Sequence, residues 1–174
     1  MVSNFGHRLA NAVTTVGAPL ALGLDPHLNR FPKSFQDRWL RKTGTQRRTI
    51  AAEAIVDFNS QAIDAAKGLV AAIKPQFAFY EQLGSAGFEA LEETCRQARE
   101  SGLLIIGDAK RGDISSTAAA YAQAILSPDG PFYCDSVTLN PWMGMDTIEP
   151  FLPYCRDCGS GVFVLLRTTN PGAK

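Results

Sequence analysis

The 174-residue sequence contains 17 basic and 17 acidic side chains, so its formal net charge is zero. A neutral chain lacks the general attraction to nucleic acid or anionic lipid that a basic chain has. No apolar run approaches the roughly 18 residues that a membrane helix needs. We therefore expect one soluble domain, residues 1–174, that binds neither nucleic acid nor membranes.

The amino-terminal stretch is mildly apolar. Two threonines, a glycine and a proline interrupt it between positions 14 and 19. We therefore expect a short helix running into a strand, rather than a signal peptide, and a cytoplasmic protein. The first strand is expected at 19–25, where apolar residues end at Asp25 and a proline follows. An insertion at about 27–46 comes next, and we expect a loop there with at most one helix.

The rest of the chain alternates apolar strands with helical patterns. We expect helices at 47–67, 88–101, 114–126 and 148–152, and strands at 68–75, 103–110, 136–140 and 161–167. Such alternation implies parallel strands joined by right-handed crossovers. Strands that are apolar throughout are buried on both faces. The pattern fits either an open doubly wound sheet or a closed (β/α) barrel.

Polar residues at the strand ends separate these two folds. Each expected strand delivers them at its carboxyl end: Asp25, Lys74, Asp108 with Lys110, Asn140, and Arg167 to Asn170. In a barrel these ends converge on one mouth, where the active sites of that fold lie. The sequence has neither of the glycine-rich nucleotide loops GxGxxG and GxxxxGK[ST]. We predict a TIM (β/α)8 barrel, an α/β fold, of which this chain contains about the first five βα units.

The stretch GDAKRGDISST, residues 107–117, places opposed charges directly after an apolar strand. Asp108 and Lys110 are two positions apart, so their side chains are expected on one face of the strand. Lys74 ends the neighbouring strand, and Asp113 lies just beyond, near the start of a helix. The sequence predicts an alternating row of these four residues. An ammonium held between carboxylates stays charged, which suits a proton donor, although a plain salt-bridge ladder is an alternative.

The segment Asp108-Ala-Lys-Arg-Gly-Asp-Ile-Ser-Ser-Thr117 resembles the DxKxxDI..T signature of orotidine 5′-phosphate decarboxylases, in their larger bacterial (type 2) branch. Further matches are Gly23-Leu-Asp-Pro26, Ile73-Lys-Pro75 and Arg167-Thr-Thr-Asn-Pro-Gly-Ala173, so the resemblance runs through essentially the whole chain. It implies a lyase that converts orotidine 5′-monophosphate to uridine 5′-monophosphate, the last step of de novo UMP synthesis. It also implies that the enzyme uses no cofactor or metal and forms a homodimer with shared active sites.

The resemblance implies catalytic roles for the charged residues. Lys110 would protonate C6 of the pyrimidine after carbon dioxide leaves. Asp108 would lie against the departing carboxylate, and Lys74 would hold Asp108 and contact the ribose. Because decarboxylation leaves a carbanion with no obvious electron sink, an ammonium fixed at C6 is the kind of group that the reaction needs.

Substrate-binding roles are implied for residues at the edges of the matching motifs. Asp113 would complete the catalytic charged row and would also enter the site of the partner subunit, as would Ile114 and Thr117. Asp25 would bind the ribose hydroxyls, and Thr169 would contact the pyrimidine ring. From the residues alone, Asp25 could equally begin a turn, and Thr117 could be one more residue of a helix.

Two other interpretations stay open. A magnesium-dependent sugar-phosphate decarboxylase or aldolase of the same superfamily also carries DxKxxD, but places an acidic metal ligand where this chain has Lys74. The second interpretation is an inactive fragment, because two phosphate-binding segments of the family, a glycine-rich loop and a later arginine, have no counterpart in this chain. Since a complete barrel has about 250 residues, we expect a C-terminally incomplete chain.

Cys155 and Cys158 have CxxC spacing without a second pair, so we expect ordinary thiols rather than a zinc site.

Overall fold

The computed structural model of the chain describes residues 3–173. Five parallel strands form one sheet in chain order, namely β1 (Ala21–Leu24), β2 (Ala72–Pro75), β3 (Leu104–Arg111), β4 (Ser136–Leu139) and β5 (Gly161–Val164). Strands that pair with the next strand in sequence, with helices in between, have the arrangement of successive βα units in a (β/α)8 barrel. The predicted fold class is therefore confirmed.

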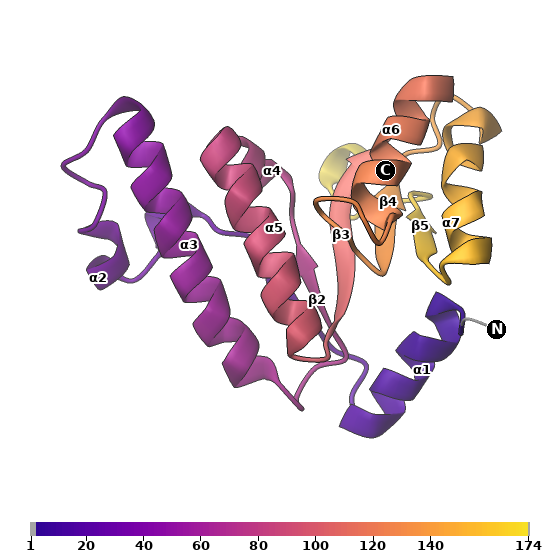
Figure 1. Cartoon of the computed structure of the whole chain (residues 1–174), viewed down its shortest axis with the longest axis horizontal. Helices are drawn as coiled ribbons and strands as arrows, with labels where there is room; N and C mark the ends of the chain where they lie inside the picture. Colours follow the sequence, from indigo (N-terminus) through magenta and orange to yellow (C-terminus); the bar gives the residue numbers. More distant parts are fainter. Residues whose placement is uncertain (1–2, 174) are drawn as a thin grey trace.

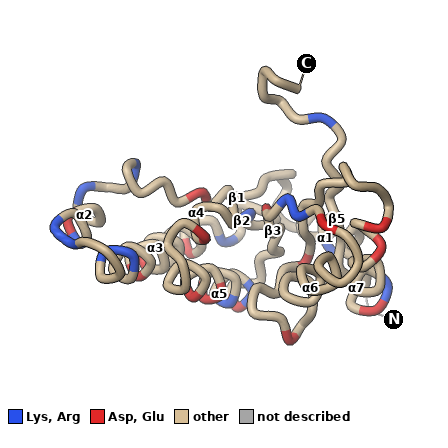
Figure 2. The backbone as a smooth tube through the Cα atoms, turned by 90° about the horizontal axis from the view of Figure 1, so that it is seen from above, with Lys and Arg blue, Asp and Glu red and all other residues tan. Residues whose placement is uncertain are grey.

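In residues 3–173, seven α-helices accompany this sheet. They are α1 (Phe5–Val16), α2 (Lys33–Gln36), α3 (Gly44–Ala66), α4 (Ala78–Glu81), α5 (Ser85–Glu100), α6 (Ser115–Leu126) and α7 (Leu152–Asp157), with 3-10 turns at Leu28–Arg30, Met145–Thr147, Glu149–Phe151 and Pro171–Ala173. Figures 1 and 2 show α3, α5, α6 and α7 along the same face of the strands, with α1 below them in Figure 1. Within residues 3–173, every helix is too short or too polar to cross a bilayer.

Helix α5 shows why the long helices form where the sequence predicts them. Its buried residues recur every three or four positions, at Gly87, Ala90, Leu91, Thr94, Cys95 and Ala98, so a single stripe faces the core. The helix ends just before Gly102, whose φ of 76° is the left-handed conformation that glycine adopts most readily after a helix. Helix and strand periodicity therefore agree with the observed packing.

The strands are shorter than their apolar runs. The segment that starts at Gly68 is a turn, and Leu69 is 64% exposed, so β2 begins only at Ala72. At the other end, β5 stops at Val164 and Leu166 is fully exposed. Apolar composition alone does not tell a strand from the turn that leads into it.

The core combines small and branched apolar residues from the strands with the inner faces of the helices. The strand residues Ile73, Ile105, Val137 and Leu139 are completely buried. Residues 27–46 pack on this body through an aromatic cluster of Phe31, Phe35, Trp39 and Phe58. This packing places the long loop after β1 against α3.

Candidate active site

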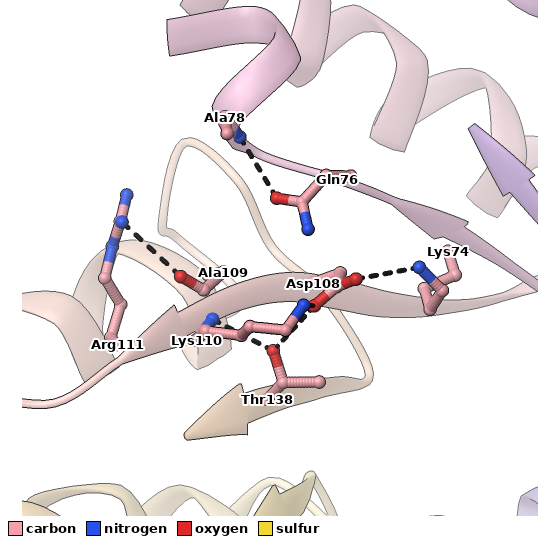
Figure 3. A network of polar contacts seen from close by, with 8 residues as sticks. All are labelled: Lys74, Gln76, Ala78, Asp108, Ala109, Lys110, Arg111 and Thr138. Atoms are coloured by element: carbon pink, nitrogen blue, oxygen red, sulfur yellow. Dashed lines mark hydrogen bonds and ion pairs between the residues drawn. The ribbon is translucent and has the colours of Figure 1, made fainter. Parts of the chain in front are cut away.

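The carboxyl ends of three neighbouring strands meet at one group of polar side chains. Lys74 comes from β2, Asp108 and Lys110 come from β3, and Thr138 comes from β4 (Figure 3). The parallel register brings these strand ends side by side, because β2 and β4 pair with opposite edges of β3. The three charged residues that the sequence predicted to be close together therefore do lie together.

Asp108 is the centre of this group. Its carboxylate accepts a hydrogen bond from Lys74 Nζ at 2.8 Å on Oδ2 and one from Lys110 Nζ at 2.5 Å on Oδ1. Thr138 Oγ1 donates to the same Oδ1 at 3.1 Å. The Asp108 residue is only 6% exposed, whereas the Lys74 and Lys110 side chains are 35% and 45% exposed. Two partly exposed ammonium groups thus flank a carboxylate that is shielded from water.

The ionisation of Asp108 follows from two opposing effects. Burial alone would raise its pKa, because a charged carboxylate loses hydration. The hydrogen bonds and positive charges of Lys110 and Lys74 outweigh this, so the pKa of Asp108 lies below its ordinary value. The carboxylate is therefore ionised at neutral pH, and it holds both ammonium groups by charge-assisted hydrogen bonds.

Lys110 reaches Asp108 through an irregular part of β3. The register shifts between Gly107 and Arg111, and Lys110 has a φ of 47°, in the left-handed region. Its backbone N–H donates to Thr138 Oγ1 at 2.9 Å. The simple expectation from strand alternation gave the right neighbours, but a bulge rather than a regular strand brings them together.

The predicted fourth member of the row lies apart from it. Asp113 Oδ1 accepts a hydrogen bond from the backbone N–H of Ile114 at 2.8 Å, and within residues 3–173 Asp113 forms no ion pair. Within the single chain, the group around Asp108 therefore has three of the four predicted members, and Asp113 lies outside it. Asp113 lies between β3 and α6, and its side chain accepts its hydrogen bond from Ile114, the residue that caps α6.

The other four predicted site residues surround this group at different places. Asp25 is exposed at the end of β1, where it lines a cavity of about 190 Å³ together with His27, Arg30 and Phe58. Ile114 and Thr117 are exposed where α6 begins. Thr169 belongs to the segment after β5, which extends away from the strands in Figure 2.

Thr138 is the residue that sequence reasoning missed. It lies one position before the end of β4, and it contacts both Asp108 and the backbone of Lys110. A hydroxyl near the carboxyl end of β4, next to the strand that carries Asp108, is the signal that could have found it. Its hydrogen bonds connect the charged row to a third strand.

The surroundings of Asp108 are unfavourable for a cation. Both of its oxygens already accept hydrogen bonds from ammonium groups, so a divalent metal there would be repelled by two positive charges. In the part of the chain that the structure describes, no group of three or more His, Cys, Asp or Glu side chains is arranged to hold a metal ion. Cys155 and Cys158 are free thiols, and burial raises the pKa of Cys155.

The chain is similar to known proteins over nearly its whole length. The sequence pattern of the family described as "Orotidine 5′-phosphate decarboxylase / HUMPS family" matches residues 19–174. The chain belongs to this family. Curated orotidine 5′-phosphate decarboxylases from Rhodopirellula baltica and Corynebacterium glutamicum are each 42% identical to it, over 97% and 98% of the chain.

A solved structure gives the same answer for the fold. A crystal structure from Streptomyces avermitilis, of a protein assigned as orotidine 5′-phosphate decarboxylase, superposes with a TM-score of 0.82 at 37% identity and covers 99% of the chain. The chain covers 56% of the length of each of these three relatives. It thus spans about half of the curated relatives that it matches.

Proposed function

We propose that this chain carries the catalytic residues of an orotidine 5′-monophosphate decarboxylase, which forms uridine 5′-monophosphate and carbon dioxide. The observation that supports this most strongly is the Asp108 carboxylate held by two ammonium groups at the carboxyl ends of β2 and β3. Family membership supports the same activity, because the curated relatives at 42% identity carry that name.

The proposed reaction needs no electron sink other than the protein's own charges. The bond between C6 and the carboxylate carbon breaks, its electron pair stays on C6, and carbon dioxide leaves. Lys110 Nζ then gives a proton to C6, and the neutral amine regains a proton from water. An ammonium that is already fixed in place stabilises the developing negative charge without reorganisation during the reaction.

Asp108 and Lys74 support the proton donor in this proposal. Asp108 lies against the departing carboxylate and keeps the Lys110 ammonium oriented, since one of its oxygens accepts the Lys110 hydrogen bond. Lys74 occupies the other oxygen and reaches the ribose. With 35% of its side chain exposed, Lys74 keeps a face that is open to a ligand.

The remaining predicted residues have proposed roles around the nucleotide. Asp25 binds the ribose hydroxyls, and its exposure in a small cavity at the end of β1 supports this. Thr169 contacts the pyrimidine ring. Asp113, Ile114 and Thr117 enter the site of a second subunit.

We propose that the chain forms a homodimer, because Asp113, Ile114 and Thr117 enter the site of a second subunit in this proposal. Ile114 is 47% exposed, and the loop after β4 adds Trp142 at 89% and Met145 at 58% exposure. Large exposed apolar side chains are typical of a surface that another protein covers, and we propose that a second copy of this chain covers them. We also propose a cytoplasmic location, which the four free cysteines support.

A direct assay tests the proposed reaction. Purified protein is incubated with orotidine 5′-monophosphate in EDTA, and the conversion to uridine 5′-monophosphate is followed by its ultraviolet absorbance. We expect turnover that EDTA leaves unchanged, because Asp108 is occupied by ammonium groups. Absence of turnover would favour the inactive-fragment interpretation over activity of this chain, and turnover that EDTA abolishes would favour the magnesium-dependent alternative.

A further inference from the structure

Arg111 follows the proposed proton donor directly, but its side chain takes no part in the charged row. Figure 3 shows Lys110 pointing toward the Asp108 carboxylate and Arg111 pointing away from it. The Arg111 guanidinium forms an ion pair with Glu81 on α4. It also lies over the ring of Tyr121 on α6, 5.1 Å from the centroid, and over Phe77 at 5.9 Å.

These contacts clamp the end of β3 between two helices. The Arg111 side chain is only 25% exposed and Glu81 is 32% exposed, so water weakens the ion pair less than at an open surface. A guanidinium is planar and stacks on aromatic faces while it donates at its edge. Arg111, Glu81, Phe77 and Tyr121 are called the arginine clamp below.

The helix that carries Glu81 is itself firmly anchored. Tyr80 is completely buried, and its hydroxyl accepts a hydrogen bond from Asn59 of α3 at 2.9 Å. In addition, the backbone N–H of Phe77 donates to the Asp108 carbonyl at 3.2 Å. The arginine clamp therefore ties the end of β3 to the segment that directly follows Lys74.

The backbone beside the clamp is fixed from the β4 side as well. The Arg111 carbonyl accepts a hydrogen bond from the backbone N–H of Asn140 at 2.7 Å. The N–H of Lys110 is held by Thr138. Lys110 therefore lies between fixed neighbours while its φ is 47°, a conformation that residues other than glycine seldom adopt.

We propose that Arg111 is a positioning residue, and that the arginine clamp holds Lys110 in its left-handed conformation so that the Lys110 ammonium rests on Asp108. An unclamped chain would relax toward ordinary strand angles, which would swing the Lys110 side chain away from Asp108. The clamp also sets the spacing between the ammonium groups of Lys74 and Lys110, because it joins the segments that follow them. The expected effect of Arg111 on kcat rests on the proposed function, whereas its expected effect on the position of the Lys110 ammonium does not.

The first test reads the geometry without any substrate. The carboxyl carbon of Asp108 is titrated by ¹³C NMR in wild-type protein, in Lys110→Met and in Arg111→Met. We expect Arg111→Met to raise the pKa of Asp108 part of the way toward its value in Lys110→Met, because the Lys110 ammonium moves away. Arg96→Met is the matched control, since Arg96 pairs with Glu93 and Glu100 on the exposed face of α5, and it should leave the titration of Asp108 unchanged.

The second test reads turnover of orotidine 5′-monophosphate. We expect Arg111→Met to lower kcat by about 100-fold, the loss that a misplacement of about 1 Å causes, with a much smaller change in KM. A folded Arg111→Met protein in which Asp108 titrates as in wild type and kcat is unchanged would overturn the inference. If Arg111→Met does not fold, Glu81→Gln decides by the same two measurements, because it removes the ion pair with little change in shape. Wild-type protein without turnover would contradict the proposed function, while the titration would still decide the role of Arg111.

Discussion

Gly112 offers a sharp test of how the end of β3 is packed. A Cβ atom added at this position would lie 2.7 Å from the Asn140 carbonyl oxygen and 3.0 Å from the Asn140 Cβ. These atoms have little freedom to move, because the Asn140 N–H is bonded to the Arg111 carbonyl. Gly112→Ala must therefore push the ends of β3 and β4 apart.

The cost of Gly112→Ala can be placed within a range. Forcing one extra carbon into a well-packed site costs about 1–3 kcal/mol. For a chain of this size, each kcal/mol lowers Tm by about 2–4 °C, so we expect Tm to fall by about 2–12 °C. Thermal unfolding followed by circular dichroism at pH 7 measures this change directly.

Gly23→Ala is the matched control for this prediction. An added Cβ on Gly23, in β1, would meet nothing closer than Asp25 Oδ1 at 3.8 Å, which is ordinary contact. We expect its unfolding free energy to stay within about 0.5 kcal/mol of wild type. If Gly112→Ala and Gly23→Ala unfold at the same temperature, the described contact between Gly112 and Asn140 is wrong.

Three further predictions concern the charged row and its surroundings. The pKa of folded Asp108 is lowered, so its stabilising contribution is complete above the ordinary aspartate pKa of about 3.9 and is lost as the pH falls through the folded value. In urea unfolding measured at a series of acid pH values, the free energy of unfolding of Asp108→Asn should therefore fall less steeply with pH than that of wild type. An unchanged dependence of that free energy on pH would contradict this. Thr138→Val keeps the shape of the side chain but removes its hydrogen bonds to Asp108 and Lys110. It should lower kcat by about tenfold or more, since a hydrogen bond to a charged group contributes about 1.5–3 kcal/mol. A wild-type kcat would argue against a role for Thr138. Ile114→Asp should shift the protein from dimer toward monomer in sedimentation velocity. The control Leu69→Asp, which changes a 64% exposed leucine in the turn before β2, should leave the dimer intact. An Ile114→Asp protein that remains dimeric would contradict the proposed interface.

Much of the fold could be predicted from the sequence because its signals are local. Helical spacing in residues 47–67 and 88–101 and the apolar runs between them fix the order of strands and helices. The contact of Asp108 with Lys74 followed from parallel pairing, since the carboxyl ends of neighbouring strands lie side by side. These features depend only on short-range pattern and on simple topology.

The remaining details depend on contacts that no local pattern records. The left-handed conformation of Lys110 occurs where the register with β4 shifts, and Thr138 contacts Lys110 and Asp108 at that irregularity. Asp113 lies outside the predicted row, where it bonds to the backbone of Ile114. The exposed Leu69 looked like part of a strand, although it belongs to a turn. For Lys110 and Thr138, a partner distant in the sequence decides the outcome.

Lys110→Ala, compared with Lys67→Ala, tests the central claim most directly. Lys67 is an exposed lysine at the end of α3, so its loss removes one positive charge without affecting the charged row. In a protein of the full length of its relatives, we predict that decarboxylation of orotidine 5′-monophosphate becomes undetectable in folded Lys110→Ala and stays at the wild-type rate in Lys67→Ala. Retained turnover in Lys110→Ala would contradict the assignment of Lys110 as the proton donor.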